Sequence, residues 1–394
     1  MIPRNLRHLR LFLAVADLAS VTRASDLYNV TQPAVTQALG KLETLAGGAL
    51  FTRTRQGFFL TERGTVLAAR VRRAFDLLDP ALANASARLP LTATAAQLQA
   101  LIAVVQTGNF TLAARRIGLS QPTVHRAVSQ LEQEACEPLF QRAAHGLVPT
   151  RICQTLARQA RLALAELEQA DVDLAEVDGH ETGRITIGTL PLSRSVLLPA
   201  ALHRFRQMRP RLLVSIIDGT YDTLLAGLRS GEIDLMLGAL RHPLPIADVV
   251  QDPLFHDRSV IVARPGHPLA DGRAIATADL LGYPWIVPRP GTQLRQQFES
   301  LFTAPGLPVP ESIIEAGVIL LIREYLDMND TLAFTSGRQV GTELGKGHLI
   351  RLDIPENLPL RDIGITLRGN WMPTRPQQMM LDCLRHAATA LPPL

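Results

Sequence analysis

A segment near the N-terminus occurs twice in the chain, and this repeat constrains the fold more than any other feature of the sequence. Residues 30–42 read VTQPAVTQALGKL, and residues 119–131 read LSQPTVHRAVSQL, which sets an offset of 89 residues. The same offset, with no insertion or deletion, also aligns Gly57 with Gly146. The chain therefore carries one domain twice in tandem, and two copies are too few for a solenoid.

The repeated segment predicts an amphipathic helix. In the first copy Thr31 is a hydroxyl N-cap candidate, and Pro33 falls in the first turn, where its missing N–H costs nothing. Val35, Leu39 and Leu42 follow at helical spacing and predict one buried stripe. The opposite face carries amides, a hydroxyl and a cation: Gln32, Thr36, Gln37 and Lys41.

Those polar groups suit the reading of base-pair edges in a DNA major groove. Any amphipathic surface helix would show a similar face, so the helix alone leaves both interpretations open. Each copy, however, also predicts two preceding helices, a two-stranded hairpin with a glycine turn and a long helix. This order indicates a winged helix-turn-helix, whose hairpin would place Arg53 and Arg55 along phosphates or in the minor groove. In the first copy the five elements are expected at about 4–18, 20–27, 31–46, 50–60 and 62–86.

Length and composition indicate a multidomain globular protein. A chain of 394 residues is too long for one core, and no apolar run reaches the roughly 18 residues of a membrane span. The apolar residues near the N-terminus are helix-spaced and interrupted by Asp17, which favours a helix over an export signal. Three isolated cysteines support neither a disulfide framework nor zinc ligation. We therefore expect a cytoplasmic protein without membrane contact.

Positive charge concentrates at the N-terminal end. Residues 1–90 hold twelve Lys and Arg against six Asp and Glu, and residues 91–162 hold seven against three. Residues 163–182 hold seven acids and no Lys or Arg, whereas residues 183–394 are nearly balanced at twenty-one against twenty. The asymmetry favours a polyanion as the partner of the N-terminal half, although a solvated basic surface would give the same count.

The C-terminal half alternates predicted strands and helices. Strands are expected at RITIGTL, LLVSII and IDLMLGAL, and later at SVIVA, PWIV, SIIEAG and TLAFT. The alternation predicts a mostly parallel sheet covered by helices. Two chain crossings, near Asp257 and Leu360, would divide it into two α/β lobes of a periplasmic-binding-protein-like domain. Lobe I is expected at about 183–257 and 362–394, and lobe II at about 258–361.

The quoted segments resemble the LysR-type transcriptional regulators. The resemblance rests on TQPAVTQAL and LETLAGGALFTRTRQGFFLTERG in the first copy and on NFTLAARRIGLSQPTVHRAVSQLEQEACEPLF in the second. It extends to PRLLVSIIDGTYDTLLAGLRSGEIDLMLGAL and YPWIVPRPGT in the C-terminal half. Members normally carry one DNA-binding domain per chain, whereas this chain has two. The resemblance implies winged helix-turn-helix domains with linker helices at 1–88 (the first head) and 89–182 (the second head), and an effector-binding domain at 183–394.

The two heads differ at the positions that would read DNA. Thr36 and Gln37 of the first head correspond to His125 and Arg126 of the second. Arginine forms bidentate hydrogen bonds with guanine, whereas glutamine forms them with adenine. We therefore predict that the two heads recognise different half-sites.

The predicted DNA-contacting residues lie on the helices and hairpin of each head. In the first head they are Arg23, Thr31, Gln32, Pro33, Thr36, Gln37, Lys41, Arg53 and Arg55. In the second head they are Ser120, Gln121, Pro122, Thr123, His125, Arg126, Arg142 and His145. The second head has Leu112 in place of Arg23 and has lost a hairpin arginine, so a structural or dimerising role for it is the alternative hypothesis.

The two long helices, at about 62–86 and 151–176, present Leu, Ala and Val at helical spacing. The resemblance implies that such a linker helix pairs with the linker helix of a partner. We predict that the two long helices of one chain pair with each other and make a pseudo-dimer of heads. A fragment ending at residue 180 that must dimerise to bind DNA would contradict this prediction.

An effector would bind beyond the carboxyl ends of the C-terminal strands, where several helices begin and their free N–H groups favour anions. Ordinary helix capping is the alternative role for each hydroxyl there. The predicted effector-binding residues are Leu192, Ser193, Thr220, Arg289, Thr292 and Gly317.

The sequence thus predicts a DNA-binding transcription regulator whose promoter binding is modulated by a small anionic effector, without a cofactor. Expected partners are double-stranded DNA, the effector and further copies of the chain, with RNA polymerase as an additional candidate. Scattered histidines and the lack of a nucleophile elbow, metal-ligand spacing or phosphate-binding loop argue against an enzyme. The alternative is a small-molecule-binding protein whose N-terminal domains serve oligomerisation.

Overall fold

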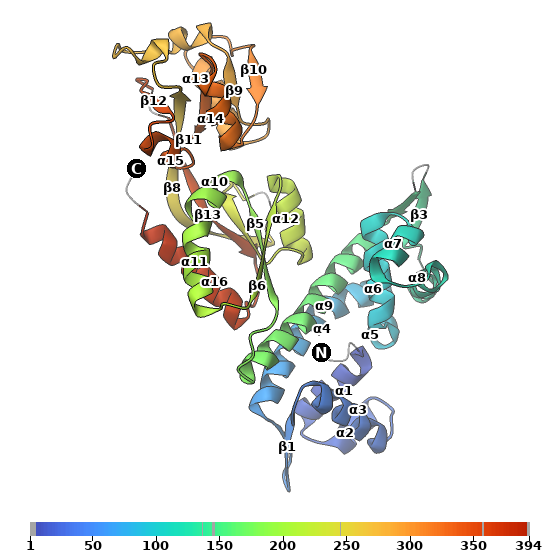
Figure 1. The fold of residues 1–394 in the computed structure, drawn as a ribbon. Helices are drawn as coiled ribbons and strands as arrows, with labels where there is room; N and C mark the ends of the chain where they lie inside the picture. Colours follow the sequence, from blue (N-terminus) through green and yellow to red (C-terminus); the bar gives the residue numbers. More distant parts are fainter. Residues whose placement is uncertain (1–4, 136, 144–145, 245, 357, 392–394) are drawn as a thin grey trace. The chain divides into compact units, whose positions relative to one another are not determined.

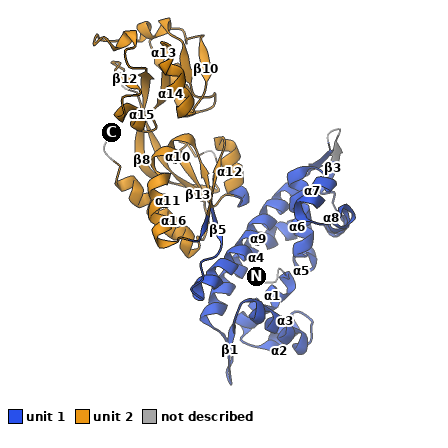
Figure 2. Ribbon diagram, in the orientation of Figure 1, with its two compact units in different colours: residues 1–185, 211–213, 229–232 blue, residues 186–210, 214–228, 233–394 orange. Residues whose placement is uncertain are grey.

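The computed structural model describes residues 5–135, 137–143, 146–244, 246–356 and 358–391. The chain divides into two compact units (Figure 2). Unit 1 comprises residues 1–185 with the short stretches 211–213 and 229–232, and unit 2 comprises the remainder.

The first half of unit 1 has the predicted order of elements. It contains α1 (Leu6–Leu18), α2 (Val21–Leu27), α3 (Gln32–Leu45), β1 (Phe51–Thr54), β2 (Gly57–Leu60) and α4 (Glu62–Ala85). The observed bounds lie within two residues of the predicted ones, because N-caps at Asn5, Ser20, Thr31 and Thr61 begin the four helices.

The second half of unit 1 repeats this order. After the short helix α5 (Leu89–Thr92), which the sequence did not predict, come α6 (Ala95–Thr107), α7 (Phe110–Ile117), α8 (Gln121–Ala135), β3 (Phe140–Ala143), β4 (Gly146–Pro149) and α9 (Arg151–Val177). In both halves the strands form an antiparallel hairpin.

Individual hydrogen bonds also recur at the offset of 89 residues. Glu43 Oε1 accepts from the Leu50 N–H at 3.0 Å, and Glu132 Oε1 accepts from the Leu139 N–H at the same distance. Each bond ties the end of the third helix of its half, α3 or α8 (the predicted reading helices), to the start of the hairpin. The two halves of unit 1 therefore share their local contacts as well as their order of elements.

The hairpin turn requires glycine in both halves. Gly57 has φ +136°, and a Cβ there would lie 2.5 Å from the carbonyl oxygen of Ala19 at the end of α1. Gly146 has φ +124°, and its Cβ would lie 3.0 Å from the carbonyl oxygen of Gly108 at the end of α6. Only glycine allows the turn to approach the preceding helix this closely.

Helices α4 and α9 lie side by side and run antiparallel (Figure 1). Arg63 near the start of α4 pairs with Asp178 just after α9, whereas Arg73 further along α4 contacts Glu166. Helices α1–α3 precede α4, and helices α6–α8 precede α9. Because each group is attached to the start of its own long helix, the two groups lie at opposite ends of the pair.

Unit 2 is built on one nine-stranded arrangement with the order β10-β9-β11-β8-β13-β7-β5-β6, with β12 beside β8. Its lobe I part contains β5 (Arg184–Thr189), α10 (Pro191–Val196), α11 (Leu198–Met208), β6 (Leu213–Asp218), α12 (Tyr221–Ser230), β7 (Leu235–Ala239) and α16 (Arg375–Thr389). Helices α11 and α16 pack against each other beside this sheet (Figure 1). Leu197 lies between α10 and α11 and divides this helical segment in two.

The lobe II part packs two cores, one on each side of its sheet. Its elements are β9 (Trp285–Val287), α13 (Gln293–Thr303), β10 (Ile313–Glu315), α14 (Ile319–Asp327), β11 (Leu332–Ser336), α15 (Gly341–Gly345), β12 (Ile350–Leu352) and the turns η1 (Pro268–Ala270) and η2 (Thr277–Gly282). Ile261 faces the core that contains Phe298 of α13, whereas Val260 and Val262 face the core that contains Ile322 of α14. The alternation follows from the two-residue period of a strand.

The prediction of a mostly parallel sheet is wrong, because the sheet is mixed. β5 pairs with β7, and β9 pairs with β10 and β11, in parallel. β8 (Val249–Ala263) and β13 (Leu360–Arg368), however, run antiparallel to each other and to β7, β11 and β12. Alternation of strands and helices indicates parallel pairing only where a helix connects two neighbouring strands. No helix lies between β7 and β8, so the chain order gives no indication of parallel pairing there.

The two crossings predicted near Asp257 and Leu360 are the long strands β8 and β13. β8 pairs with β13 from Val249 to Arg258, and from Ser259 onward it pairs with β11 and β12. β8 therefore passes from the sheet of lobe I into the sheet of lobe II, whereas β13, which begins at Leu360 where the chain returns, pairs with β8 and with β7 of lobe I.

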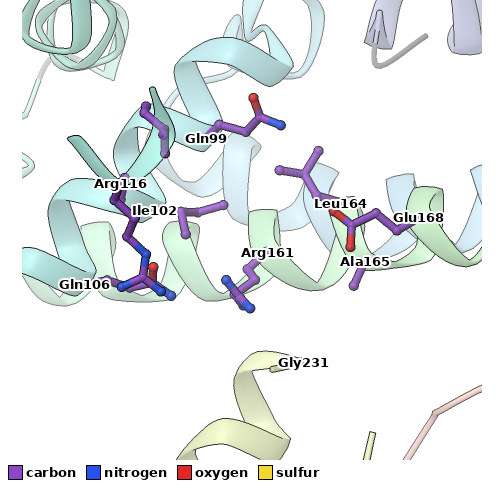
Figure 3. A pocket seen from close by; sticks show the side chains of 11 residues that line it. Gln99, Ile102, Gln106, Arg116, Arg161, Leu164, Ala165, Glu168 and Gly231 are labelled. Atoms are coloured by element: carbon purple, nitrogen blue, oxygen red, sulfur yellow. The ribbon is translucent and has the colours of Figure 1, made fainter. Parts of the chain in front are cut away.

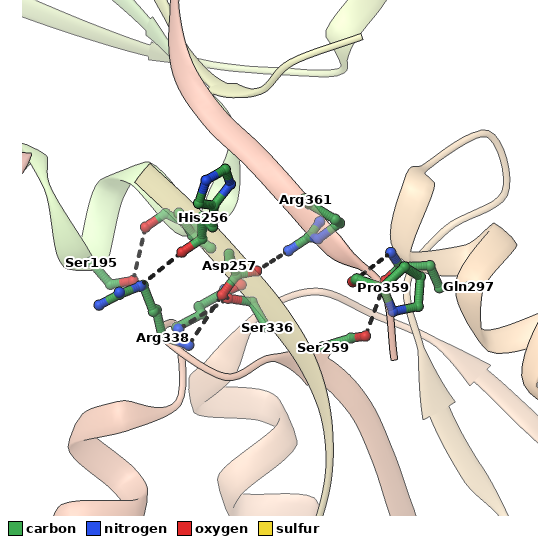
Figure 4. Close-up of polar contacts among 11 residues, drawn as sticks. Ser195, His256, Asp257, Ser259, Gln297, Ser336, Arg338, Pro359 and Arg361 are labelled. Carbon is green, nitrogen blue, oxygen red and sulfur yellow. Dashed lines mark hydrogen bonds and ion pairs between the residues drawn. The ribbon is translucent and has the colours of Figure 1, made fainter. Parts of the chain in front are cut away.

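A buried ion pair joins these strands at the crossing (Figure 4). Asp257 of β8 is fully buried and pairs with Arg361 of β13. The same carboxylate accepts from the Ser336 hydroxyl at 2.8 Å and from the Arg338 N–H at 3.3 Å. The charge is neutralised and hydrogen-bonded, which is what a buried carboxylate requires.

Replacing Asp257→Ala should lower the free energy of unfolding by about 3–5 kcal/mol, because Arg361 would stay buried without its carboxylate partner. Urea unfolding of the full chain measures this change. The matched control is Asp353→Ala, which removes an exposed partner of Arg351 and should change stability by less than about 0.5 kcal/mol. Equal effects of the two substitutions would contradict the assigned role of Asp257.

Candidate nucleic-acid interface and effector site

The reading helix α3 has the predicted polarity. The Thr31 hydroxyl accepts from the Ala34 N–H at 3.4 Å, and Pro33 lies in the first turn. Val35, Leu39 and Leu42 are buried in the core of unit 1, as predicted. The amphipathic helix that the sequence predicted is therefore confirmed, and its polar face is free to meet a ligand.

All nine predicted DNA-contacting side chains of the first head are exposed. Arg23 lies on α2, Arg53 on β1, and Arg55 in the turn between β1 and β2. The Arg53 guanidinium lies 5.6 Å from the centre of the Phe58 ring, so the hairpin supports its own cation. The remaining six are on or next to α3: Thr31, Gln32, Pro33, Thr36, Gln37 and Lys41.

Helix α8 of the second head has a hydroxyl cap and a buried apolar stripe like those of α3, but its exposed side chains differ. The Ser120 hydroxyl accepts from the N–H of Thr123 at 3.4 Å, and residue Thr123 is half-buried. Val124, Val128 and Leu131 are buried. The exposed face presents Gln121, Pro122, His125 and Arg126.

The two divergent side chains of α8 are held by local contacts. The His125 ring lies 5.0 Å from the Phe110 ring and 3.5 Å from the Ser129 hydroxyl. Arg126 donates from Nε to the Pro122 carbonyl at 3.4 Å. In the hairpin, Arg142 lies on β3, and His145 lies outside the described residues.

Sequence reasoning missed one basic feature of the second head. Helix α7 ends with Arg115 and Arg116, both exposed, where the corresponding positions of α2 hold Asp26 and Leu27. The second head therefore gains two cations on this helix although it lacks a counterpart of Arg23. The adjacent pair of arginines in the sequence was a signal that could have found them.

The predicted effector-binding residues comprise two helix-capping threonines, a buried serine and three further residues. Thr220 accepts from the Thr223 N–H at 3.3 Å, and Thr292 accepts from the Arg295 N–H at 3.2 Å, so both cap helices. Ser193 on α10 is fully buried, and its hydroxyl has no hydrogen-bond partner among the described residues. Leu192 beside it is buried, whereas Arg289 and Gly317 are exposed.

Three residues that the sequence did not predict lie in this region: Tyr221 begins α12, Gln293 begins α13, and Arg241 follows β7. Tyr221 is buried, and its hydroxyl lacks a partner within the described part of the chain; burial raises its pKa. The Arg241 guanidinium lies 4.6 Å from the centre of the Tyr221 ring and donates to the Gly291 carbonyl at 3.1 Å. Gln293 donates to the Leu240 carbonyl at 2.9 Å, while its side-chain oxygen is buried and unpartnered in that same part of the structure.

These contacts connect the two lobes where an effector is expected. Tyr221 and Arg241 belong to lobe I, and Gln293 belongs to lobe II. Buried oxygen atoms normally have hydrogen-bond partners, so unpartnered ones indicate positions where a ligand or water completes the bonding. No burial pattern readable from the sequence distinguishes Tyr221 or Gln293 from ordinary helix residues.

The described cysteines are unsuited to thiolate chemistry. Burial raises the pKa of the Cys153 thiol to about 12 and also raises the pKa of the Cys383 thiol. Among the described residues no group of His, Cys, Asp and Glu side chains is arranged to hold a metal ion. The described part of the chain thus offers neither a reactive cysteine nor a metal centre.

Unit 1 also contains a cavity of about 350 Å³ among α6, α7 and α9 (Figure 3). Its lining combines Ile102 and Leu164 with the charged Arg161 and Glu168. None of the predicted DNA-contacting or effector-binding residues lines it. The cavity is therefore separate from both predicted sites, and we assign no ligand to it.

Two family models match the chain. The model described as "LysR substrate binding domain" matches residues 178–389. The model described as "Bacterial regulatory helix-turn-helix protein, lysR family" matches twice, at 6–65 and at 95–154. The chain belongs to the LysR family.

Relatives support this membership along the whole chain. The HTH-type transcriptional regulator GalR of Pseudomonas putida is 34% identical over 388 residues, which is 98% of each chain. A full-length variant of OxyR from Pseudomonas aeruginosa has a TM-score of 0.56 at 20% identity, and CbnR, solved in complex with its target DNA, has 0.50 at 19%. Each structure covers 74% of this chain and 98% of its own, so the unmatched quarter is about the size of one repeat.

Family membership establishes the broad function. The chain is a transcription regulator of the LysR type that binds DNA and responds to a small-molecule effector, and it is not an enzyme. DNA binding is favoured over the alternative that the N-terminal domains serve only oligomerisation. None of the described helices is long and apolar enough to span a membrane.

Replacing Arg53→Ala should weaken binding to all DNA sequences alike, because a hairpin cation that contacts phosphate carries no sequence information. The slope of log affinity against log salt concentration should fall in magnitude by about one. Fluorescence anisotropy at several salt concentrations measures both effects. Arg351→Ala, an exposed arginine of unit 2, is the matched control, and a slope unchanged in Arg53→Ala would contradict the phosphate contact.

Proposed function

We propose that the chain binds its operator through two unequal winged helix-turn-helix heads, residues 1–88 and 89–182, each of which includes a linker helix. The observation that carries the proposal is the contrast between the two reading helices. Their buried stripes are equivalent, whereas Thr36 and Gln37 are replaced on the same exposed face by His125 and Arg126. The fold of both heads is kept while the groups that meet bases differ.

Both heads are equipped to bind DNA. The second head exposes Gln121 and Arg126 on α8 and two arginines on α7. Those cations compensate in charge for the missing counterpart of Arg23, which weakens the hypothesis that the second head has only a structural role. An arginine at position 126 that meets guanine would add about 1–3 kcal/mol of discrimination.

The antiparallel pairing of α4 and α9 supports simultaneous binding of both heads. It relates the heads by an approximate two-fold rotation, which is the symmetry that two-headed helix-turn-helix proteins use on two half-sites. With 24 residues, α4 is about 36 Å long, close to one turn of the DNA helix. We infer half-sites spaced by one helical turn or a multiple of it.

Footprinting of the DNA next to the gene tests this proposal. Wild type should protect two segments, Gln32→Ala should lose one, and Gln121→Ala should lose the other, because each substitution disables one reading helix. Selection of binding sites from a random DNA pool should return two different half-sites. Two identical half-sites, or a footprint insensitive to Gln121→Ala, would contradict the proposal that the heads are unequal.

We propose further that the effector is a small molecule with an anionic group, bound where α10, α12 and α13 begin. Ser193, Tyr221 and Gln293 offer buried oxygen atoms without partners in the described structure, and Arg241 supplies a cation. The predicted residues Thr220 and Thr292 shape the same helix starts by capping them. Free N–H groups at those starts favour an anion.

Replacing Tyr221→Phe separates effector binding from stability. Removal of a hydroxyl that bonds the effector should raise the dissociation constant about tenfold, a loss of about 1.4 kcal/mol. The free protein should not lose stability, because the hydroxyl has no partner in it. Thermal shift of the full chain against a panel of carboxylates and sugar acids measures both, with a bound ligand at 100 times its dissociation constant adding about 2.7 kcal/mol.

The control for this experiment is Ser300→Ala, an exposed position of α13. No thermal shift of wild type with any anion would contradict the anionic effector. We place the protein in the cytoplasm, where DNA and metabolites are both accessible. Self-association through the effector-binding domains would bring four heads together, and RNA polymerase is a further candidate partner.

A further inference from the structure

An arginine of α4 is buried against α9. Arg70 of α4 is 1% exposed, and its guanidinium faces three side chains of α9. It lies 2.8 Å from Glu166, 2.8 Å from the side-chain oxygen of Gln169 and 2.7 Å from Asp173. Polar groups of this kind are rare between paired helices, where apolar side chains supply most of the contact.

Two further ion pairs have the same polarity. Arg63 of α4 donates to Asp178, which follows α9 directly, at 3.3 Å. Arg73 of α4 lies 3.2 Å from Glu166. In the ion pairs of Arg63, Arg70 and Arg73, α4 therefore contributes the cations and the α9 segment contributes the anions.

The offset of 89 residues shows which side chains would face each other if α4 paired with a second α4, or α9 with a second α9. At the offset of 89 residues, the counterpart of Arg70 is Gln159, and the counterparts of Glu166 and Asp173 are Leu77 and Asn84. Two α4 helices paired in the same register would bury Arg70 against a leucine and an asparagine. Two α9 helices would bury both carboxylates against a glutamine. Neither combination neutralises its charges.

We propose that the Arg70 network makes the pairing of the linker helices exclusive, so that each chain joins its own two unequal heads and does not pair α4 with the α4 of another chain. This inference rests on the proposed two-headed architecture. The partner that the α4 surface fits is thus the acidic face of α9 in the same molecule. A polar group that is satisfied in only one arrangement excludes the others.

The Arg70 network contributes more to the choice of pairing partner than to the free energy of unfolding. Burial raises the pKa of the Asp173 carboxyl although its hydrogen bond with Arg70 lowers it, so desolvation offsets much of the attraction. Buried ion pairs can often be replaced by apolar residues without loss of stability. The apolar stripe of both helices, which includes Leu67, Leu78 and Leu164, already supplies the stabilising contact.

A test in cis and in trans separates pairing within one chain from pairing between chains. Arg70→Glu in the full chain should increase amide hydrogen exchange in α4 and α9 by about 100-fold or more, because it opposes two carboxylates. The combined variant Arg70→Glu, Glu166→Gln and Asp173→Arg on one chain should restore protection. Arg72→Glu, an exposed position of the same helix, is the control and should leave protection unchanged.

The trans arm places the substitutions on different chains. Arg70→Glu on one chain is co-expressed with Glu166→Gln and Asp173→Arg on another, and mixed assemblies are purified through two tags. Protection should stay lost, because each α4 meets only the α9 of its own chain. Restored protection in the mixture would show pairing between chains and would overturn the proposal, as would failure of the combined cis variant.

An apolar variant tests exclusivity itself. Arg70→Met with Glu166→Met and Asp173→Leu should keep the helices protected but add larger, concentration-dependent assemblies in sedimentation, because an α4 without a buried charge can pair with another α4. An unchanged mass over the whole concentration range would overturn the proposal. These experiments measure the pairing of α4 and α9. They can fail while the two heads still recognise different half-sites, and the two heads can recognise the same half-site while the pairing is exclusive.

Discussion

The guanidinium of Arg70, held by carboxylates inside the helical unit, fixes how α4 and α9 lie against each other, and the placement of both heads depends on that pairing. Apolar contacts along the two helices would tolerate several registers, because leucine and alanine recur every turn. A charge that finds its partners in one register removes that freedom. The antiparallel direction then sends each head to the opposite end of the pair.

The duplication separates what the fold requires from what recognition requires. Val35, Leu39 and Leu42 of α3 correspond to Val124, Val128 and Leu131 of α8, and all six are buried. The glycine of each hairpin turn is likewise retained, because a Cβ would collide with the preceding helix. Exposed positions on the same helices carry different groups, since changes there cost the fold little. Two copies of one scaffold can therefore present two recognition surfaces.

The effector-binding domain contains two kinds of buried polar group: those whose hydrogen bonds are complete, and those that lack a partner among the described residues. At the crossing of the lobes, Asp257 is fully partnered by Arg361 and its neighbours, which makes the paired strands a firm connection. At the starts of α12 and α13, Tyr221 and Gln293 keep buried oxygen atoms without partners in the described residues. A site that must accept a ligand leaves bonding capacity open, whereas both oxygens of the Asp257 carboxylate at the crossing are bonded.

Much of this protein follows from the sequence by itself. The offset of the repeat, the apolar period of the reading helices, the hairpin glycines and the crossings near Asp257 and Leu360 are local or periodic signals, and the structure agrees with each. The first part of β8 escaped prediction because it contains a proline and several charged residues, and the mixed sheet could not be foreseen because pairing direction depends on neighbours distant in sequence. Only the tertiary structure could decide that Arg70 is buried against α9 and that the Tyr221 hydroxyl lacks a partner among the described residues. Burial and satisfaction of a polar group are properties of everything packed around it, and no local pattern encodes them.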